Sequence, residues 1–475
     1  MQTRSRDTPY AKNPDASRNK NAAEYGEERD GKHDSKEPTS KTVYVIFASL
    51  IFDLLGFTVI LPLLPSLLDY YGQKDQDGLY HVLKQSVTGF RELVGAPDTP
   101  RWNSVLFGGL LGSVFSLLQF LTAPVVGALS DVYGRKPIML LTLVGISSSY
   151  VLWALSRNFT VFVLARIVGG LSKANINLST AIVTDVSSSR TRGKGMAFIG
   201  IAFSLGFTLG PMIGALFAGW ARSHAQEFYT TPALFALVLS VIDIIYVYLY
   251  LQESLPPKKR AKSLTSEFKN ASTLVNPVAL FRFSAVDNIS MKDLKSMQKV
   301  GMVYFLYLFF YSGLEFTLTF MVHNRFQYDH MQQGKMFFFI GIIMMLVQGG
   351  YVRRLRPGSE KTVTTRSMVI LIPAFVLMAF ANSAVVLYAG LTMFAFASAT
   401  IVPCLTTVIS RFGGVDQKGA VMGIFRSLGA LSRALGPAVA STVYWSCGPQ
   451  ICYCVGGLCL LLPLFLIRGI QVVDA

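Results

Sequence analysis

Apolar residues run along this chain in long stretches that polar loops separate. Twelve windows are long and apolar enough to form membrane-spanning helices, since such a helix needs about 20 residues to cross the hydrocarbon core of a bilayer. The windows lie near residues 42–67, 104–129, 138–156, 159–183, 196–219, 231–251, 300–323, 333–352, 364–381, 384–409, 419–442 and 449–467. The pattern predicts an all-α membrane protein with twelve transmembrane helices.

Polar segments divide these windows into two sets of six. Residues 1–40 are rich in Asn, Asp, Glu, Lys and Ser, which predicts a disordered cytosolic tail. A second polar segment contains PPKKRAK and predicts a cytosolic linker. We therefore expect a tail, an N-terminal six-helix bundle, a linker, a C-terminal six-helix bundle and a cytosolic C-terminus, at residues 1–40, 41–252, 253–299, 300–469 and 470–475.

The two sets of six windows look like weak parallel repeats. Gly56 in DLLGF corresponds to Gly313 in YSGLEF, and LGP at 209–211 corresponds to LGP at 435–437. Parallel halves joined by a linker are typical of two-bundle transporters. We therefore expect two pseudo-symmetric six-helix bundles.

Composition agrees with a chain that lipid surrounds, and the distribution of charge predicts its orientation. Charged residues make up 15% of the chain, where a soluble domain has roughly 25%. A net charge of +16 could indicate nucleic-acid binding, but Lys and Arg concentrate in alternate loops, as the positive-inside rule describes. We expect no nucleic-acid partner, both termini in the cytosol, and insertion in the plasma membrane, with a nuclear or other internal membrane as the alternative.

Patterns typical of catalysis or of cofactor binding are not evident. The sequence shows no paired catalytic carboxylates, no Ser/His/Asp set and no phosphate-binding loop. Its five cysteines fall in the last third of the chain without metal-type spacing. We expect no enzymatic activity, no cofactor and no metal site.

The stretch GALSDVYGRKP, residues 127–137, follows the second window and places an acid, a flexible turn and two bases at the membrane surface. It resembles the inner-loop signature G-x3-D-x2-G-R-K of the major facilitator superfamily. The resemblance implies an Arg that pairs with an acid at the end of helix four and an Asp that contacts the start of helix eleven. The implied conformational switch consists of Gly127, Asp131, Gly134, Arg135, Lys136 and Asp185.

Three further stretches resemble signatures of the drug:proton antiporter branch of this family. DLLGFTVILPLLP, with Asp53, resembles the helix-one signature, and RIVGGLSKA, with Arg166, resembles the helix-four signature. GFTLGPMIG resembles the helix-five signature, in which missing side chains let helices of the two halves approach closely. Its expected packing residues are Gly206, Gly210, Pro211 and Gly214.

Longer phrases resemble one group within the family. SKANINLSTAIVTDVSSSRTRGKG, GLEFTLTFMVHNRF and FRSLGALSRALGP are similar to the tetracycline-transporter-like proteins of animals. That resemblance implies transport of organic anions, including amphiphilic carboxylate drugs. Periodicity and composition do not show this substrate.

Seven ionisable residues lie within the predicted spans, where each costs on the order of 2.5–3.5 kcal/mol or more near the bilayer centre. They are Asp53, Arg166, Lys173, Asp243, Glu315, Arg426 and Arg433. The family architecture implies a central cavity lined by helices one, four, seven and ten, and surplus positive charge there should favour an amphiphilic anion. The predicted substrate-binding residues are Arg166, Lys173, Asn177, Glu315 and Arg433.

Asp53 and Glu315 are the candidates for proton coupling, because a partly buried carboxyl beside a cation can exchange its proton when a substrate anion binds the cation. The alternative interpretation is that Asp53–Arg166 and Glu315–Arg433 are structural ion pairs. Asp243 receives no role from the sequence.

The predicted function is secondary active transport of amphiphilic organic anions by alternating access, with proton coupling left open. One alternative is a proton-coupled antiporter of cationic or zwitterionic, tetracycline-like drugs, which is favoured if Lys173 points away from the cavity. Another is a transport-inactive membrane scaffold or sensor. The coupling acids and the inner-loop motif argue against this alternative.

Overall fold

The structure is a computed structural model. It describes residues 40–74, 78–94, 100–188, 192–223, 229–261, 274–284, 286, 289–356, 358–412 and 418–470. The predicted tail, apart from Ser40, and residues 471–475 of the predicted C-terminus lie outside these ranges. Within them, all regular elements are helices, in agreement with the predicted all-α class.

The helices of the first half follow the predicted windows, and the first window bends. Pro62 has no backbone N–H to donate, so the chain passes through a short 3₁₀ turn before it continues as a helix. The elements are α1 (Lys41–Thr58), η1 (Leu61–Leu63), α2 (Leu64–Lys74), α3 (Leu79–Val94), α4 (Pro100–Tyr133), α5 (Arg135–Ala154), α6 (Phe159–Ser172), α7 (Asn175–Val186), α8 (Arg192–Ser223) and α9 (Thr230–Tyr250).

The second half begins within the predicted linker, since α12 starts at Met291 with Ser290 as its N-cap. The helix thus begins within the predicted linker, and the division of the chain into domains stays a prediction. The elements are η2 (Pro257–Lys259), α11 (Pro277–Arg282), α12 (Met291–Phe326), α13 (His330–Leu346), η3 (Val347–Tyr351), η4 (Val352–Arg354), α14 (Glu360–Phe380), α15 (Ala384–Ser410), α16 (Lys418–Cys459) and α17 (Leu461–Arg468).

Eleven helical stretches of the described chain are long and apolar enough to cross a membrane, and the last of them, Ala420–Arg468, has 49 residues. At 1.5 Å per residue it would be about 74 Å long, more than twice the roughly 30 Å hydrocarbon core. Gly448 interrupts it with φ 86° and ψ 169°, directly before Pro449. The stretch therefore contains two crossings, and the twelve predicted spans are all present.

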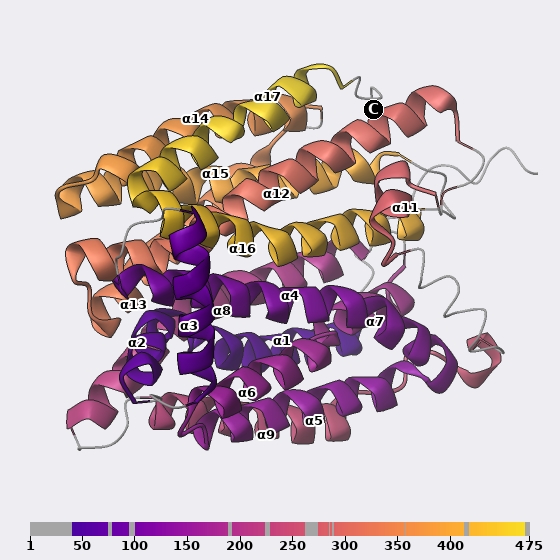
Figure 1. Ribbon diagram of the computed structural model, residues 1–475. Helices are drawn as coiled ribbons and strands as arrows, with labels where there is room; N and C mark the ends of the chain where they lie inside the picture. Colours follow the sequence, from indigo (N-terminus) through magenta and orange to yellow (C-terminus); the bar gives the residue numbers. More distant parts are fainter. Residues whose placement is uncertain are drawn as a thin grey trace, which may run out of the picture. The chain divides into compact units, whose positions relative to one another are not determined.

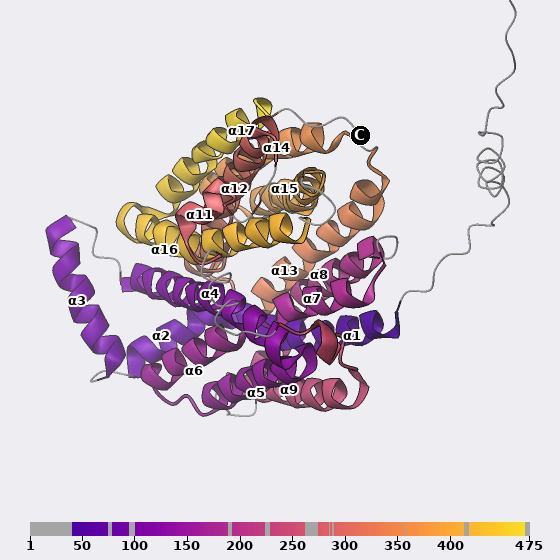
Figure 2. The same cartoon turned by 90° about the vertical axis from the view of Figure 1, so that its right-hand side faces the viewer.

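Apart from α3, which runs across the others, the long helices lie roughly parallel to one another, with the first half in the lower part of Figure 1 and the second half in the upper part. Between the halves, α4 packs against α16 and α8 packs against α13. Figure 2 looks along the helices and shows the same division. We call the side with the α4–α5 turn and α11 the linker side, and the opposite side the far side.

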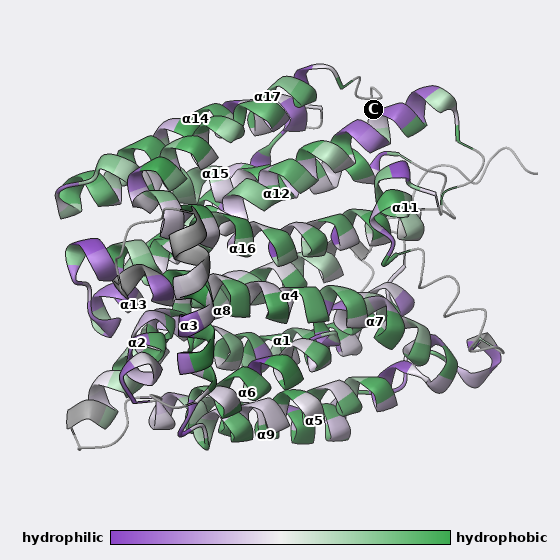
Figure 3. Cartoon of the chain, viewed as in Figure 1, coloured by the Kyte–Doolittle hydropathy of each residue, from purple (hydrophilic) through white to green (hydrophobic). Residues whose placement is uncertain are grey.

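Hydropathy follows this arrangement. Hydrophobic residues cover the middle of the long helices, and hydrophilic residues gather toward their ends (Figure 3). Inside a bilayer only closed hydrogen-bonded structures such as helices can carry the backbone. The described fold is therefore that of a helical membrane protein.

Candidate functional site

On the linker side, the chain turns sharply from α4 into α5 at Gly134. This residue has φ 105°, a conformation that side chains disfavour. A Cβ at this position would also lie 2.5 Å from Glu253 Oε2 and 2.8 Å from an Arg260 nitrogen. The positive φ therefore favours glycine at this turn, and the ends of two long side chains pack closely against it.

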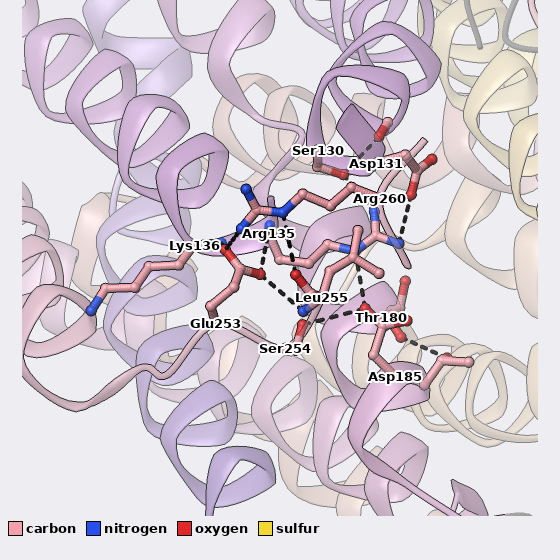
Figure 4. A network of polar contacts seen from close by, with 12 residues as sticks. Ser130, Asp131, Arg135, Lys136, Thr180, Asp185, Glu253, Ser254, Leu255 and Arg260 are labelled. Atoms are coloured by element: carbon pink, nitrogen blue, oxygen red, sulfur yellow. Dashed lines mark hydrogen bonds and ion pairs between the residues drawn. The ribbon is translucent and has the colours of Figure 1, made fainter. Parts of the chain in front are cut away.

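Arg135, the first residue of α5, connects two acids across this turn (Figure 4). Its guanidinium lies 2.7 Å from Asp131 Oδ1 and 3.0 Å from Asp185 Oδ2. It also donates a 2.5 Å hydrogen bond to Ser130 Oγ. The pair that the resemblance implied between Arg135 and Asp185 is thus formed, whereas a role as a conformational switch stays a prediction.

Glu253 completes this network and was missed from the sequence. It accepts hydrogen bonds from the backbone N–H of Arg135 at 2.9 Å and of Lys136 at 3.3 Å, so it caps the N-terminus of α5. It also forms a 3.6 Å ion pair with Arg260. A carboxylate is favoured at a helix N-terminus because it meets unpaired N–H groups there. The available signal was a single acid next to PPKKRAK, directly after the sixth window.

The Lys136 side chain points elsewhere and donates a 2.8 Å hydrogen bond to the carbonyl oxygen of Tyr248. The implied contact of Asp131 with the start of helix eleven involves a segment near residues 413–419, whose side chains lie outside the described residues. That contact stays a prediction.

Halfway across the membrane, the fourth span is broken, although its window predicted a continuous helix. α6 ends at Ser172, α7 begins at Asn175, and Lys173 has φ −78° and ψ 29°. The side-chain amide of Gln119 donates a 3.2 Å hydrogen bond to the Lys173 carbonyl oxygen that the break exposes. Broken helices at this depth are typical of transporter binding sites, where unwound backbone is available to ligands.

Lys173 and Asp53 form a buried ion pair at this break, with Nζ 2.6 Å from Oδ1. The side chains are 3% and 1% exposed, respectively. The predicted alternative pair Asp53–Arg166 is therefore wrong, because Lys173 occupies that place. The Lys173 ammonium is thus buried and paired in this conformation, and its role in substrate binding stays a prediction.

Arg166 instead lies against an aromatic ring. Its guanidinium carbon is 4.3 Å from the centre of the Phe115 ring. Phe115 stacks on Phe57 at 5.6 Å, and Lys173 Nζ lies 4.7 Å from the centre of the Phe57 ring. Cations are attracted to the faces of such rings. Arg166 has no ion pair among the described residues, and its role in substrate binding stays a prediction.

In the second half, Glu315 accepts a 3.0 Å hydrogen bond from the Tyr311 hydroxyl. Arg433 interacts electrostatically with Glu315 and with Tyr304, but the predicted ion pair Glu315–Arg433 is not formed within 4.0 Å. Arg433 is exposed in this conformation. Asn177, the remaining predicted substrate residue, is exposed on α7. Among the described residues, Arg166 in the first half and Arg433 in the second thus form no ion pair with an acid.

The predicted glycine packing occurs, but between different helices. A Cβ on Gly206 would lie 2.5 Å from Leu54, and one on Gly210 or Gly214 would overlap the last turn of α1. These glycines therefore pack α8 against α1 within the first half, which corrects the predicted contact between halves. Close approach of α8 to α13 instead depends on glycines of α13, because a Cβ at Gly341 would overlap Thr208.

The two halves meet on the far side. Trp445 Nε1 donates a 3.0 Å hydrogen bond to Asn103 Oδ1, and His323 Nε2 lies 3.1 Å from Asp69 Oδ2. Midway along, the backbone N–H of Ala438 donates a 2.8 Å hydrogen bond to the Ser113 hydroxyl.

The contact between α4 and α16 changes along their length. Gly109 of α4 faces Ser441 of α16 so closely that a Cβ would overlap it. Gly127 and Gly423 lie 18 residues, or five helical turns, from these two positions and hence on the same faces of their helices. A Cβ at either would meet nothing within 4 Å. The α4–α16 contact is therefore tight on the far side and looser toward the linker side, where Arg426 and Met196 still connect the halves.

Comparisons with known proteins agree with this geometry. Residues 46–437 match the family model described as Major Facilitator Superfamily. The chain is 48% identical over 431 residues to the mouse (Mus musculus) "Major facilitator superfamily domain-containing protein 10", covering 90% of this chain and 92% of that protein. It is 25% identical over 395 residues to the Escherichia coli "Tetracycline resistance protein, class B", covering 83% and 86%.

A solved structure, that of "the human organic anion transporter MFSD10 (TETRAN)", is similar with a TM-score of 0.77 and 48% identity, covering 91% of this chain and 100% of that one. The resemblance to animal tetracycline-transporter-like proteins is thereby confirmed. With a family model that matches most of its length, and with relatives 48% identical over nine tenths of it, the chain belongs to the Major Facilitator Superfamily, a family of membrane transporters.

Proposed function

We propose that this protein is a secondary transporter of amphiphilic organic anions. The observation that carries the proposal is that three arginines within the spans lack an ion-pair partner in the described part of the chain. Arg166, Arg426 and Arg433 form no ion pair among the described residues. Charges at this depth are costly without a partner. A substrate anion would supply that partner, and the neighbouring aromatic rings would accommodate its apolar part.

Two further findings support an anionic substrate. Phe115 lies under Arg166, and Tyr304 interacts with Arg433, so each cation has an aromatic neighbour. The human relative with 48% identity is described as an organic anion transporter.

Transport by alternating access fits the observed asymmetry between the two sides. The substrate would enter or leave on the linker side, where α4 and α16 diverge, and a second conformation would open the far side. The network of Arg135, Asp185 and Glu253 lies at the linker-side ends of the first half, and we propose that it biases the equilibrium between the two conformations.

Proton coupling is part of the proposal, with Asp53 and Glu315 as carriers. Among the described residues, Lys173 donates a hydrogen bond to Asp53 and Tyr311 donates one to Glu315. Protonation of Asp53 would release Lys173 from its ion pair, and the ammonium could then take part in binding an anion. Both termini are proposed to be cytosolic, and the plasma membrane is the proposed location.

The test is uptake into vesicles that contain the purified protein. A panel of labelled organic anions and cations of similar size is offered with and without a pH gradient. We expect saturable uptake of anions that carry an aromatic group and a stronger signal with the gradient. Uptake of cations alone would overturn the proposal.

A proton-coupled antiporter of cationic or zwitterionic drugs is the second candidate. It is favoured by the buried Asp53–Lys173 pair, which removes one cation from the set available to substrate. The same vesicle panel separates the two candidates. A scaffold without transport activity would take up neither class of compound.

A further inference from the structure

Asp243 on α9 is an acid in the interior of the first half that the proposed anion site does not use. Its residue exposure is 0%, and neither carboxyl oxygen has a hydrogen bond within the described protein. α9 packs against α1, α5 and α8. The carboxyl is therefore surrounded by neighbouring helices and does not face lipid alone. An ionised carboxylate in such surroundings costs several kcal/mol unless it is paired.

The neighbours of Asp243 come from three elements. On α1, Ser49 and Asp53 lie one turn apart on the same face, and both act on Asp243. Lys173, at the break between α6 and α7, also acts on it electrostatically. Tyr150 of α5 interacts with Asp243, Asp53 and Arg166.

Other titratable groups near Asp243 are few. Tyr246 lies one turn further along α9 and interacts with it. No titratable group of the described part of α8 acts on Asp243. Lys173 is thus the one cation that acts directly on Asp243 among the described residues.

Lys173 alone cannot balance the charges of Asp53 and Asp243 if both acids are ionised, and Arg166 reaches this cluster only through Tyr150. Lys173 Nζ is engaged by Asp53 Oδ1 at 2.6 Å, while the second oxygen of Asp53 and both oxygens of Asp243 have no hydrogen-bond partner within the described protein. One ammonium can neutralise only one carboxylate. Because Lys173 is committed to Asp53, the second acid is best accommodated as the neutral acid.

We propose that Asp243 is a proton-binding carboxyl of this transporter and that it shares Lys173 with Asp53. This inference rests on the proposed function, to which it adds a binding site for the coupling proton. In the observed conformation the proton forms an O–H bond on Asp243 and Asp53 holds Lys173. When the proton leaves, the Asp243 carboxylate competes for the same ammonium.

That competition provides a route from proton release to the fourth span. Lys173 follows the last residue of α6, and within the described chain its backbone hydrogen bonds at the break are one from Gln119 and a long one of 3.4 Å to the Gly170 carbonyl oxygen. A shift of its ammonium toward Asp243 would therefore move the break between α6 and α7. Arg166 lies on α6, so the same movement reaches the proposed anion site.

The first test measures protonation directly, without substrate. Infrared difference spectra of the full-length purified protein are recorded as the pH is cycled between acid and alkaline values. We expect the band of a buried protonated carboxyl in the wild type and its loss in Asp243→Asn. Asp329→Asn is the matched control, because Asp329 caps α13 on the far side and Asn also serves as an N-cap. Identical bands in the wild type and Asp243→Asn would overturn the proposal.

The second test separates coupling from transport. In vesicles, we expect Asp243→Asn to retain exchange of labelled anion without a pH gradient. The stimulation of uptake by a pH gradient should fall at least about tenfold, which corresponds to a loss of roughly 1.4 kcal/mol of coupling free energy. Unchanged stimulation, or equal loss of exchange and stimulation in a folded protein, would overturn the proposal.

The tests also give a result if the wild type does not transport anions or if the variant does not fold. If the wild type moves no anion, the proposed function fails, while the infrared test still decides whether Asp243 binds a proton. If Asp243→Asn does not fold, Asp243→Glu keeps the carboxyl, and a shift of the band in this variant supports the assignment whereas an unshifted band contradicts it.

Discussion

At the scale of single residues, the buried pair Asp53–Lys173 is the feature that most changes expectations. A lysine near the middle of a membrane span suggests a ligand for a substrate anion. In the structure its ammonium is 2.6 Å from a carboxylate, and both side chains are buried. The pair therefore belongs to the interior of the first half in the observed conformation.

This pair makes a prediction for Lys173→Met. Removing one partner leaves Asp53 as an uncompensated buried acid, so the variant should be destabilised by about 3–5 kcal/mol. The double variant Asp53→Asn with Lys173→Met removes both charges and should regain most of that stability. Thermal unfolding of the purified proteins measures both effects. A Lys173→Met protein as stable as the wild type would show that the pair does not stabilise the fold.

Arg433 makes the opposite prediction, because it is exposed and has no ion pair among the described residues. Arg433→Met should leave unfolding nearly unchanged and weaken anion binding by a factor on the order of ten to a hundred, the effect of losing a charge-assisted contact of roughly 1.5–3 kcal/mol. Binding of a labelled anion to the purified protein measures this. Arg468→Met, at the linker-side end of α17, is the matched control and should bind normally. Equal affinities for both variants would remove Arg433 from the site.

At the scale of elements, glycines set how closely helices approach. Three glycines on α8 face α1, and Thr58 at the end of α1 donates a 2.8 Å hydrogen bond to the Gly206 carbonyl oxygen. Small residues permit such close backbone approach in membrane helices. The GFTLGPMIG stretch therefore fixes the packing inside one half, and the contact between halves depends on the partner helix.

Gly210→Ala tests this packing. The new Cβ would overlap the Thr58 hydroxyl and a neighbouring carbonyl, so helix α8 must shift, at a cost of about 1–3 kcal/mol. Gly200→Ala on the same helix meets nothing within 4 Å and should be neutral or slightly stabilising, because Ala favours helix. Unfolding temperatures of the two variants give the comparison. Similar temperatures would contradict the assigned α1–α8 contact.

At the scale of the whole molecule, α4 of the first half and α16 of the second pack tightly on the far side and more loosely on the linker side. Gly109 and Gly127 occupy the same face of α4, five turns apart, yet the first is tightly packed and the second is not. Helices packed in this way change arrangement as rigid bodies rather than by bending. Each glycine should therefore favour a different conformation.

We expect Gly109→Ala to disfavour the observed conformation, because its Cβ would overlap Ser441. Gly127→Ala should favour the observed conformation, because a Cβ fits there now and would be crowded once the linker side closes. Spin labels at Tyr44 and Met291, at the linker-side ends of α1 and α12, report the separation of the halves. A longer separation should dominate in Gly127→Ala and a shorter one in Gly109→Ala. The same distribution in both variants would contradict the rigid-body description.

The sequence by itself determined the class, the span positions and the family. Twelve apolar windows appear as helices because a bilayer requires every backbone group to be hydrogen-bonded within the segment. The pair Arg135–Asp185 was also predictable. The inner-loop motif identifies Arg135, and the family resemblance places its acidic partner at the end of the fourth window, where Asp185 stands.

Only the tertiary structure decided which charged residues become partners. Asp53 pairs with Lys173 rather than Arg166, and Glu253 caps a helix more than one hundred residues earlier in the chain. Such contacts depend on how each helix is rotated about its axis and on where the fourth span breaks. The hydropathy pattern predicts neither of these. Asp243 is the clearest example, because its position in the sequence indicates only that burying it is costly, whereas the packing of α9 against α1 brings it under the influence of Asp53 and Lys173.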